Sequence, residues 1–501
     1  MDRPQPSPSA IPSAAPGAAV APVRARSVGL LLGPVLFCAM LFLPPPTGLE
    51  PAGWRVAAVA VLMAVLWMTE AVPIPVTGLL PLALFPTLGI ASGAATSAPY
   101  ADPLIFLFLG GFLIALGLER WNLHRRIALG VVSLVGTQPA ALVGGFMLAT
   151  AFLSMWVSNT ATAVMMLPIG LSVIGLLTRE GEEAGGFGVA LLLGIAYAAS
   201  IGGLATLIGT PPNALLAAFM TRTYGVEIGF AQWMAIGLPI TAALLLLAWL
   251  ILTRLAFRLP RMPVTGSTEL IRDELAKLGR LSGPEIRVGL VFLAAAFLWV
   301  ARPALSGVLP AGVNDTVIAI AAGIALFVIP AGGDAPRGTA LLDWSAAKRL
   351  PWGVLLLFGG GLSLAAAIGS SGLAAWIGAG FAGLNAWPVI LVVLLVTAAI
   401  VFLTELTSNT ATAAAFLPLM ASVAPALGAD PFLLTIPVAL AASCAFMLPV
   451  ATPPNAIVFG SGHLTVAQMA RAGFLLNLAA IAAIVGLVWL FVGTVFVVPG
   501  R

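Results

Sequence analysis

Charged residues are scarce in this chain. Only 8% of its 501 residues are Asp, Glu, Lys or Arg, whereas a soluble globular protein carries about 25% because its surface must be wetted. A soluble globular protein is therefore excluded. The 2 histidines, His124 and His463, are too few and too scattered for a cluster with metal-ligand spacing. The 2 cysteines, Cys38 and Cys444, lie in apolar runs and imply no disulfide framework.

Motifs of catalysis are missing as well. The chain contains no Ser/His/Asp arrangement, no HExxH and no paired Asp motif, which disfavours a membrane enzyme. A net charge of +4 would suggest nucleic acid in a soluble protein. Here the basic residues fall in short loops between apolar runs, where they determine membrane topology. We therefore expect neither an enzyme nor a nucleic-acid partner.

Apolar residues dominate instead, at 60% of the chain and a mean hydropathy of +1.10. Because a crossing needs about 20 apolar residues, we expect an all-α polytopic membrane protein with the lipid bilayer as its partner. The eleven predicted crossings are about 28–45, 54–72, 75–93, 103–119, 188–208, 233–256, 286–303, 313–330, 352–371, 431–449 and 472–497. Two further segments, about 138–178 and 386–425, are interrupted by polar residues and proline. Each is either two spans or one re-entrant hairpin.

The basic residues predict the orientation. They form five clusters, and an even number of predicted crossings separates each cluster from the next. By the positive-inside rule all five face the cytoplasm, which leaves the C-terminus outside. Residues 1–26, rich in Pro, Ala and Ser, are predicted to be a disordered cytoplasmic N-terminus, followed by a first transmembrane helix within 27–50. Residues 259–284 are predicted to be a cytoplasmic linker.

Two motifs occur twice. Ser158-Asn159-Thr160-Ala161-Thr162 recurs as 408–412, an offset of 250, and Thr210-Pro211-Pro212-Asn213-Ala214 recurs as 452–456, an offset of 242. The duplication divides the chain into repeat 1 (51–258) and repeat 2 (285–501). Each repeat holds five predicted crossings and one hairpin segment, and an odd number of crossings inverts the second copy. Inverted repeats with polar breaks point to a secondary transporter, whereas a channel needs a continuous pore.

The motifs have a chemistry in common. At a hairpin tip, free carbonyls and side-chain oxygens can replace the water shell of a cation such as Na⁺, and the next helix offers N–H groups to an anion. A double proline breaks a helix and frees the preceding carbonyls. Either motif alone could merely cap or kink a helix, but the duplication of both favours an ion site. Because neither motif contains Lys or Arg, co-bound Na⁺ would have to balance an anionic substrate.

Other polar residues have predicted structural roles. Glu405, three residues before Ser408, is an intramembrane carboxylate; we favour a role in stabilising the hairpin by accepting hydrogen bonds over a direct functional role. Asp102 and Asp315 lie near predicted span ends, where capping or solvated roles are expected. The glycine pair at 110–111 and its counterpart at 360–361 suit close helix packing.

From about residue 28 to 497 the sequence resembles the divalent anion:sodium symporter (DASS) family, through its paired Ser-Asn-Thr and Thr-Pro-Pro-Asn segments. The resemblance implies eleven transmembrane helices plus two re-entrant helical hairpins, divided into scaffold and transport domains. It also implies a homodimer and an elevator mechanism. By motif position, it implies sodium ligands at Ser154, Ser158, Asn159 and Gly209 in one repeat and at Thr404, Ser408, Asn409 and Ala451 in the other. It implies substrate contacts at Asn159, Thr160, Asn409, Thr410, Thr452 and Pro453.

These observations predict Na⁺-coupled symport of a C4-dicarboxylate such as succinate, malate or fumarate across a cell inner membrane. Three alternatives within the family stay open: a dicarboxylate exchanger, a citrate carrier and a sulfate carrier.

Overall fold

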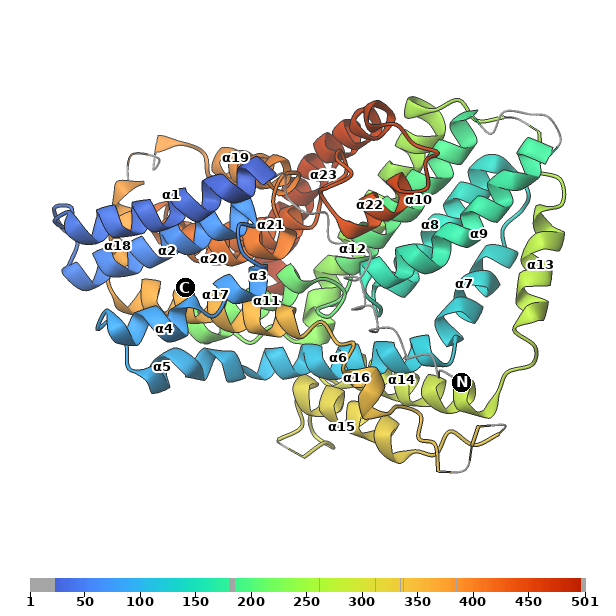
Figure 1. Ribbon diagram of the computed structural model, residues 1–501, viewed down its shortest axis with the longest axis horizontal. Coiled ribbons are helices and arrows are strands. Elements are labelled where there is room, and N and C mark those ends of the chain that lie inside the picture. The colour runs from blue at the N-terminus through green and yellow to red at the C-terminus, as the bar shows by residue number, and fades with distance from the viewer. Residues whose placement is uncertain are drawn as a thin grey trace, which may run out of the picture.

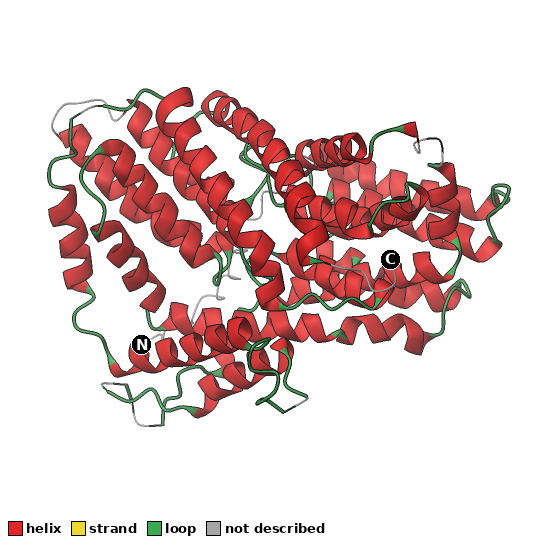
Figure 2. Ribbon diagram, turned by 180° about the vertical axis from the view of Figure 1, so that it is seen from behind, coloured by secondary structure: helices red, strands yellow, loops and turns green. Residues whose placement is uncertain are grey.

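The computed structural model describes residues 23–496, except 180–184 and the single positions 261, 311, 334, 337, 382, 384 and 385. These residues are helical nearly throughout (Figure 2), and their one β-type contact is an isolated bridge between Pro330 and Ala340. The predicted all-α fold is confirmed. Most of the segment predicted to be disordered, 1–26, lies outside the described residues.

Up to residue 277, the described residues form fifteen helices. They are α1 (Val23–Phe42), α2 (Pro51–Thr69), α3 (Ile74–Thr77), α4 (Leu80–Thr87), α5 (Gly93–Ser97), η1 (Ala98–Ala101), α6 (Pro103–Arg120), α7 (Leu123–Ser133), α8 (Pro139–Ser154), α9 (Asn159–Arg179), α10 (Gly185–Gly203), α11 (Pro211–Tyr224), α12 (Phe230–Leu250), η2 (Ile251–Ala256) and α13 (Ser267–Lys277).

The second half continues in the same way. Its helices are α14 (Gly283–Ala301), α15 (Asp315–Val328), α16 (Trp344–Ala347), α17 (Trp352–Ser370), α18 (Leu373–Gly380), α19 (Val389–Thr404), α20 (Asn409–Ala426), α21 (Pro431–Ala442), α22 (Pro453–Phe459) and α23 (Val466–Val495).

Many of these helices suit a bilayer. Among the described residues, eight stretches are long and apolar enough to cross a membrane, and six shorter apolar helices accompany them. The eight stretches are Pro51–Thr69, Gly93–Arg120, Asn159–Leu176, Gly185–Gly203, Phe230–Ala256, Gly283–Ala301, Trp352–Ser370 and Val466–Val495. The chain is therefore a multi-pass membrane protein.

The predicted crossing 75–93 is not a continuous helix, and the predicted crossing 431–449 is helical only over α21. The segment 75–93 consists of α3 and α4, followed by a loop that leads into α5. Three prolines, Pro75, Pro81 and Pro86, each remove a backbone donor from this stretch. Hydropathy alone does not register these breaks, because proline interrupts the backbone hydrogen bonds without making the segment polar.

Helices α7 and α13 were not predicted from the sequence. Helix α7 follows the predicted span 103–119, and α13 lies within the predicted linker 259–284. Ion pairs hold α7 to its neighbours. Arg125 lies 2.7 Å from Glu274 of α13, and Arg126 lies 2.8 Å from Glu285 of α14. The two helices therefore form a packed polar layer at one end of the molecule, to the right in Figure 1.

The repeats correspond closely in structure. Helix α8 ends at Ser154 and α19 ends at Thr404, while α9 begins at Asn159 and α20 begins at Asn409, so the offset of 250 is kept at both tips. Helix α10 packs against α8 and α9, and α21 packs against α19 and α20 in the same way. Helices α10 and α21 are buried along nearly their whole lengths.

The glycine pairs allow helices to touch. Helix α6 runs across the lower part of the molecule in Figure 1, above α15, and packs against it. A Cβ atom at Gly110 would lie 2.5 Å from the backbone of Ala319 in α15, and one at Gly360 would collide with the carbonyl of Gly78. The expected packing role of both pairs is confirmed.

Candidate functional site

Each Ser-Asn-Thr motif lies at the junction of two consecutive helices. Residues 155–158 separate α8 from α9, and residues 405–408 separate α19 from α20. Asn159 and Thr160 therefore start α9, and Asn409 and Thr410 start α20. The first N–H groups of a helix have no partner within it, so both helix starts present donors and a positive dipole end.

Three oxygens crowd together at the first tip. The Ser154 hydroxyl oxygen lies 2.5 Å from Asn159 Oδ1 and 2.6 Å from the carbonyl oxygen of Ala199 in α10. A hydroxyl carries a single hydrogen and can donate it to one oxygen at a time. At least one of these close oxygen pairs therefore has no hydrogen between its members. A hard cation that takes oxygen ligands would relieve this repulsion.

The second tip repeats the arrangement with threonine. The Thr404 hydroxyl oxygen lies 2.8 Å from Asn409 Oδ1 and 2.9 Å from the carbonyl oxygen of Ala442 in α21. Ser154 and Thr404 are both completely buried. The hydroxyl, the asparagine and a carbonyl of the buried helix that follows the hairpin thus recur as one unit in each repeat.

Two irregular segments face the tips. Residues 204–210 join α10 to α11, and residues 443–452 join α21 to α22. A Cβ atom at Gly203 would lie 3.0 Å from Asn159 Oδ1 and 3.0 Å from the carbonyl oxygen of Gly209. The Gly209 carbonyl oxygen and Asn159 Oδ1 therefore both lie beside Gly203. Ala451, in the second segment, is also buried.

The asparagine of each Thr-Pro-Pro-Asn segment has a role that sequence reasoning missed. Asn213 Nδ2 donates to the carbonyl oxygens of Gly203 at 3.1 Å and Thr206 at 2.8 Å. Asn455 Nδ2 donates to those of Ala445 at 3.2 Å and Leu448 at 3.0 Å. Each asparagine ties the start of its helix to the preceding loop. The sequence did contain a signal for this role, because the asparagine recurs with the rest of its motif at the offset of 242.

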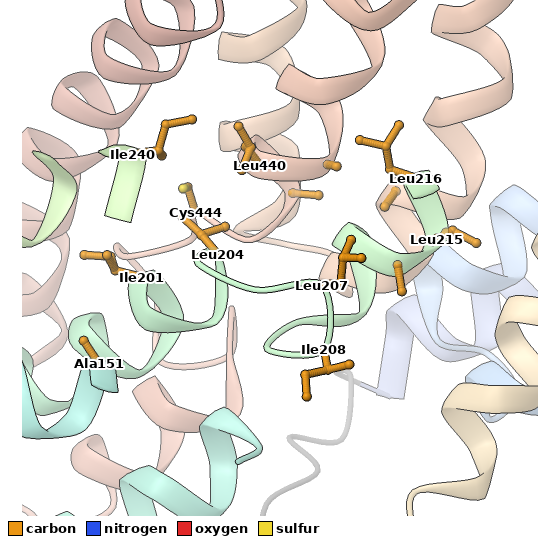
Figure 3. Packing of buried hydrophobic residues seen from close by; sticks show 14 of the residues in the cluster. Ala151, Ile201, Leu204, Leu207, Ile208, Leu215, Leu216, Ile240, Leu440 and Cys444 are labelled. Carbon is orange, nitrogen blue, oxygen red and sulfur yellow. The ribbon is translucent and has the colours of Figure 1, made fainter. Parts of the chain in front are cut away.

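The two repeats meet at these segments. The Thr210 hydroxyl oxygen lies 3.4 Å from that of Ser443. Helix α11 packs against α20 and α21, while α22 packs against α9 and α10, so each proline-broken helix crosses into the other repeat. Figure 3 shows Leu204 of the first segment beside Leu440 and Cys444 of the second repeat.

The proposed substrate ligands differ in accessibility. Asn159, Thr160, Asn409 and Thr410 are partly exposed, as a residue that contacts a soluble anion must be. Thr452 is buried, and its hydroxyl accepts from the Asn455 N–H at 3.3 Å.

The remaining predicted ligands lie at the edges of this arrangement. Ser158 is exposed and Ser408 is half-buried. The Ser158 hydroxyl accepts from the Ala161 N–H at 3.2 Å, which caps α9. Pro453 is exposed at the start of α22.

A cavity opens beside the first hairpin. It has a volume of about 480 Å³ and is lined by Glu119, Arg120, Asn122, His124, Ala161, Val164, Met165 and Arg349. Ala161 belongs to the first motif, so the cavity reaches the start of α9. A larger cavity of about 790 Å³ lies near Trp376 and contains no residue of either motif. The smaller cavity is therefore the one that bears on the site.

His124 borders this cavity and is buried. Burial lowers its pKa, and the neighbouring Arg125 lowers it further, against an opposing effect of the Leu118 carbonyl. His124 is therefore neutral near pH 7, with Nδ1 lying 3.1 Å from the Leu118 carbonyl oxygen.

Glu405 is buried behind the second tip. Its carboxylate accepts from the backbone N–H groups of Phe446, Met447 and Leu448 and from Asn477 Nδ2, at 2.7 to 3.1 Å. The predicted stabilising role is therefore observed. Glu405 stabilises the irregular segment 443–452 as well as the second tip.

Comparison with known proteins agrees with the motifs. The family described as the sodium:sulfate symporter transmembrane region matches residues 24–498. The sodium-dependent dicarboxylate transporter SdcS of Staphylococcus saprophyticus is 45% identical over 473 residues, which cover 93% of this chain and 91% of that protein. The protein of that name from Staphylococcus aureus USA300 is 45% identical over 471 residues, covering 92% and 90%.

Solved structures of distant transporters share the fold. The YdaH transporter of Alcanivorax borkumensis superposes with a TM-score of 0.53 at 14% identity, covering 94% of this chain and 97% of its own. MtrF of Neisseria gonorrhoeae gives a TM-score of 0.54 at 13% identity, covering 94% and 95%. Identities this low support a common fold alone.

Proposed function

Because the chain belongs to the sodium:sulfate symporter family, the divalent anion:sodium symporters that its motifs resemble, we propose that it couples the uptake of C4-dicarboxylates to Na⁺. The family is one of transporters, and the chain is not an enzyme. Succinate, malate and fumarate are the proposed substrates, and Na⁺ is the co-transported ion. The relatives' printed name, sodium-dependent dicarboxylate transporter, supports this choice of substrate and ion.

The observation that carries the proposal is the duplicated oxygen cluster. In each repeat a buried hydroxyl with one hydrogen lies within 2.9 Å of two other oxygens. We place one Na⁺ at Ser154, Ser158, Asn159 and Gly209, and a second at Thr404, Ser408, Asn409 and Ala451. The substrate carboxylates would then bind at Asn159, Thr160, Asn409, Thr410, Thr452 and Pro453.

Electrostatics explains why transport would be coupled. The segments 154–162, 203–213, 404–412 and 443–455 contain no Lys or Arg. A dicarboxylate bound there would carry a charge of about −2 into a region of low dielectric, where an unpaired charge is costly. Two bound Na⁺ ions would neutralise it. Substrate binding should therefore require sodium.

We place the protein in a cell inner membrane with its N-terminus in the cytoplasm and its C-terminus outside. The proposed topology has eleven crossings, two re-entrant hairpins and inverted repeats. Ion pairs between separate basic loops support a common side for these loops: Arg120 lies 2.5 Å from Asp343, and Arg125 lies 2.7 Å from Glu274. Cysteine accessibility from either side of the membrane would test the orientation.

The proposed transport cycle is an elevator movement in a homodimer, with α8–α12 and α19–α23 moving against the other helices. The cavity beside Ala161 would serve as the aqueous route on one side of the membrane. Light scattering of the purified protein would give its oligomeric state. Cross-links between α6 and α9 that trap transport would test the movement.

Uptake by proteoliposomes tests the function. Radiolabelled succinate should accumulate when an inward Na⁺ gradient is imposed and should fail to accumulate when choline replaces Na⁺. Uptake that is indifferent to sodium would contradict coupling. Counterflow against internal dicarboxylate, with sulfate and citrate as competitors, separates symport from the exchanger, citrate and sulfate alternatives.

Substitution of the motif asparagines tests the site. Asn159→Ala and Asn409→Ala should each abolish sodium-dependent uptake, because each asparagine is placed at both an ion and the substrate. Gel filtration should show an unchanged elution volume for both variants. Parental uptake by both would refute the site assignment.

A further inference from the structure

The two repeats hold their irregular segments in different ways. In the first repeat, the Thr206 hydroxyl donates to the carbonyl oxygen of Met155 at 2.6 Å, so a neutral bond ties the segment to the hairpin tip. Offsets of 250 and 242 place Glu405 and Leu448 at the corresponding positions of the second repeat. Leu448 has no hydroxyl to donate, and its backbone N–H instead donates to the carboxylate of Glu405 at 3.0 Å.

The difference in length of the segments explains why a carboxylate is needed. The segment 443–452 is three residues longer than 204–210. In the shorter segment, the N–H groups of Leu204 and Ala205 bond to carbonyls one turn earlier. In the longer one, the N–H groups of Phe446, Met447 and Leu448 point to Glu405 instead.

The geometry requires an ionised carboxylate. Oε1 accepts from Phe446 N at 2.7 Å, Met447 N at 2.9 Å and Asn477 Nδ2 at 2.8 Å, while Oε2 accepts from Met447 N at 3.1 Å and Leu448 N at 3.0 Å. Every partner is a donor, so a proton on either oxygen would face an N–H group. Among the described residues, no Lys, Arg or His forms an ion pair with Glu405.

This leaves a negative charge directly behind the second tip and none at the equivalent position behind the first. Glu405 directly follows Thr404, whose hydroxyl belongs to the second oxygen cluster, and is 3% exposed. Met155 occupies the equivalent place behind Ser154. A cation near a buried negative charge is bound more tightly, because little water intervenes to screen the attraction.

We propose that Glu405 is a positioning residue that makes the two sodium sites unequal. It fixes the segment that carries Ala451 and Thr452, and its charge makes the second-repeat site bind Na⁺ more tightly than the first-repeat site. The second site therefore fills first during the cycle. This inference rests on the proposed sodium-coupled transport.

Sodium titrations of four purified variants test the proposal. Glu405→Gln removes the charge and keeps the shape. The double variant Glu405→Met with Leu448→Thr reproduces the neutral arrangement of the first repeat, and Glu405→Asp keeps the charge on a shorter side chain. Thr206→Val is the matched control, because it removes the equivalent clamp of the first repeat without removing a charge.

The measurement is the Na⁺ concentration that gives half-maximal thermal stabilisation without substrate, together with that for half-maximal succinate uptake. We expect both to rise by about tenfold in Glu405→Gln and in the double variant, in keeping with the loss of one nearby charge. The two sodium concentrations measured for Glu405→Asp should stay closer to those of the parent than the values for either neutral variant. Thr206→Val should lower the melting temperature and leave both sodium values within about twofold of the parent.

The outcomes separate this inference from the proposed function. If the parent is neither stabilised by Na⁺ nor dependent on it for uptake, the proposed function fails and the inference with it. If the parent depends on Na⁺ but the double variant titrates like the parent, Glu405 is structural only and the inference alone is overturned. The neutral variants leave donors such as the Phe446 and Met447 N–H groups without a carboxylate acceptor. Where neither of them folds, Glu405→Asp decides the question, and a tenfold rise in its sodium values with the charge retained would overturn the inference.

Discussion

Single side chains decide how the irregular segments of this transporter are held. Asn213 and Asn455 are completely buried and donate to carbonyls seven to ten residues earlier. A carbonyl freed by a proline break must bond to something, because an unpaired buried polar group is costly. The asparagines satisfy some of these carbonyls and so leave others free for an ion.

Replacing Asn213 should destabilise the protein. Asn213→Leu removes the donor to Gly203 and Thr206 and should cost about 2 kcal/mol, because their buried carbonyls lose a partner. Thermal unfolding in detergent measures the loss. Gln138→Leu is a suitable control, since Gln138 is exposed and makes no capping hydrogen bond. Equal melting temperatures for the two variants would contradict the assigned role.

His124 should make stability depend on pH. Burial lowers its pKa in the folded protein, so below the ordinary value of about 6.5 the unfolded chain binds a proton that the folded chain does not. Stability should therefore fall as the pH drops through that value. The melting temperature of the parent should decrease more between about pH 7.5 and about pH 5.5 than that of His124→Gln. An equal decrease in both proteins would exclude this role for His124.

At the scale of elements, close contacts between helices set the architecture. Helix α6 packs against α15 through Gly110, and α17 packs against α3 through Gly360. Without a hydrophobic driving force between helices in lipid, small residues that allow close approach stabilise such pairs. Short, proline-rich α3 and α4 then fill the space that a continuous crossing was predicted to occupy.

Adding one methyl group tests this contact. A Cβ atom at Gly110 would lie 2.5 Å from the Ala319 backbone, so Gly110→Ala should separate α6 from α15 and lower the melting temperature by several degrees. Gly130, in α7, has no atom within 4 Å of such a Cβ. Gly130→Ala should be neutral or stabilising, by up to about 1 kcal/mol. A similar loss in both variants would contradict close contact as the cause, because both substitutions raise helix propensity and only Gly110 has a neighbour in the way.

At the scale of the whole molecule, the site forms only where the two repeats interlock. Helices α11 and α22 each cross into the other repeat, and Thr210 meets Ser443 between them. In the proposed site, the two oxygen clusters and the starts of α9 and α20 together bind one substrate. Ion and anion binding should consequently be coupled across the repeats.

A thermal-shift screen tests this coupling. Succinate should raise the melting temperature in NaCl and should have little effect in choline chloride, because the site segments offer no basic side chain to a dianion. Citrate and sulfate, tested in both salts, should stabilise less than succinate. Stabilisation by succinate of equal size in both salts would contradict charge compensation by Na⁺.

The sequence by itself determined several features of this protein. Scarce charge and long apolar runs established a helical membrane protein, and the duplicated motifs predicted an interruption within each of the segments 138–178 and 386–425, where the structure has breaks at 155–158 and 405–408. These features are local, because apolar length and helix-ending residues act within a few turns of the chain. The family also followed from the motifs.

Only the tertiary structure decided which distant residues meet. The partners of Glu405 lie more than 40 residues away along the chain. Met155, its neutral counterpart in the first repeat, has a role only because the fold brings the Thr206 hydroxyl to its carbonyl oxygen. The roles of Asn213 and Asn455 became clear in the same way, from the carbonyls that their loops bring within reach. Such contacts depend on how helices pack and where proline-broken segments fold back, which local pattern does not specify.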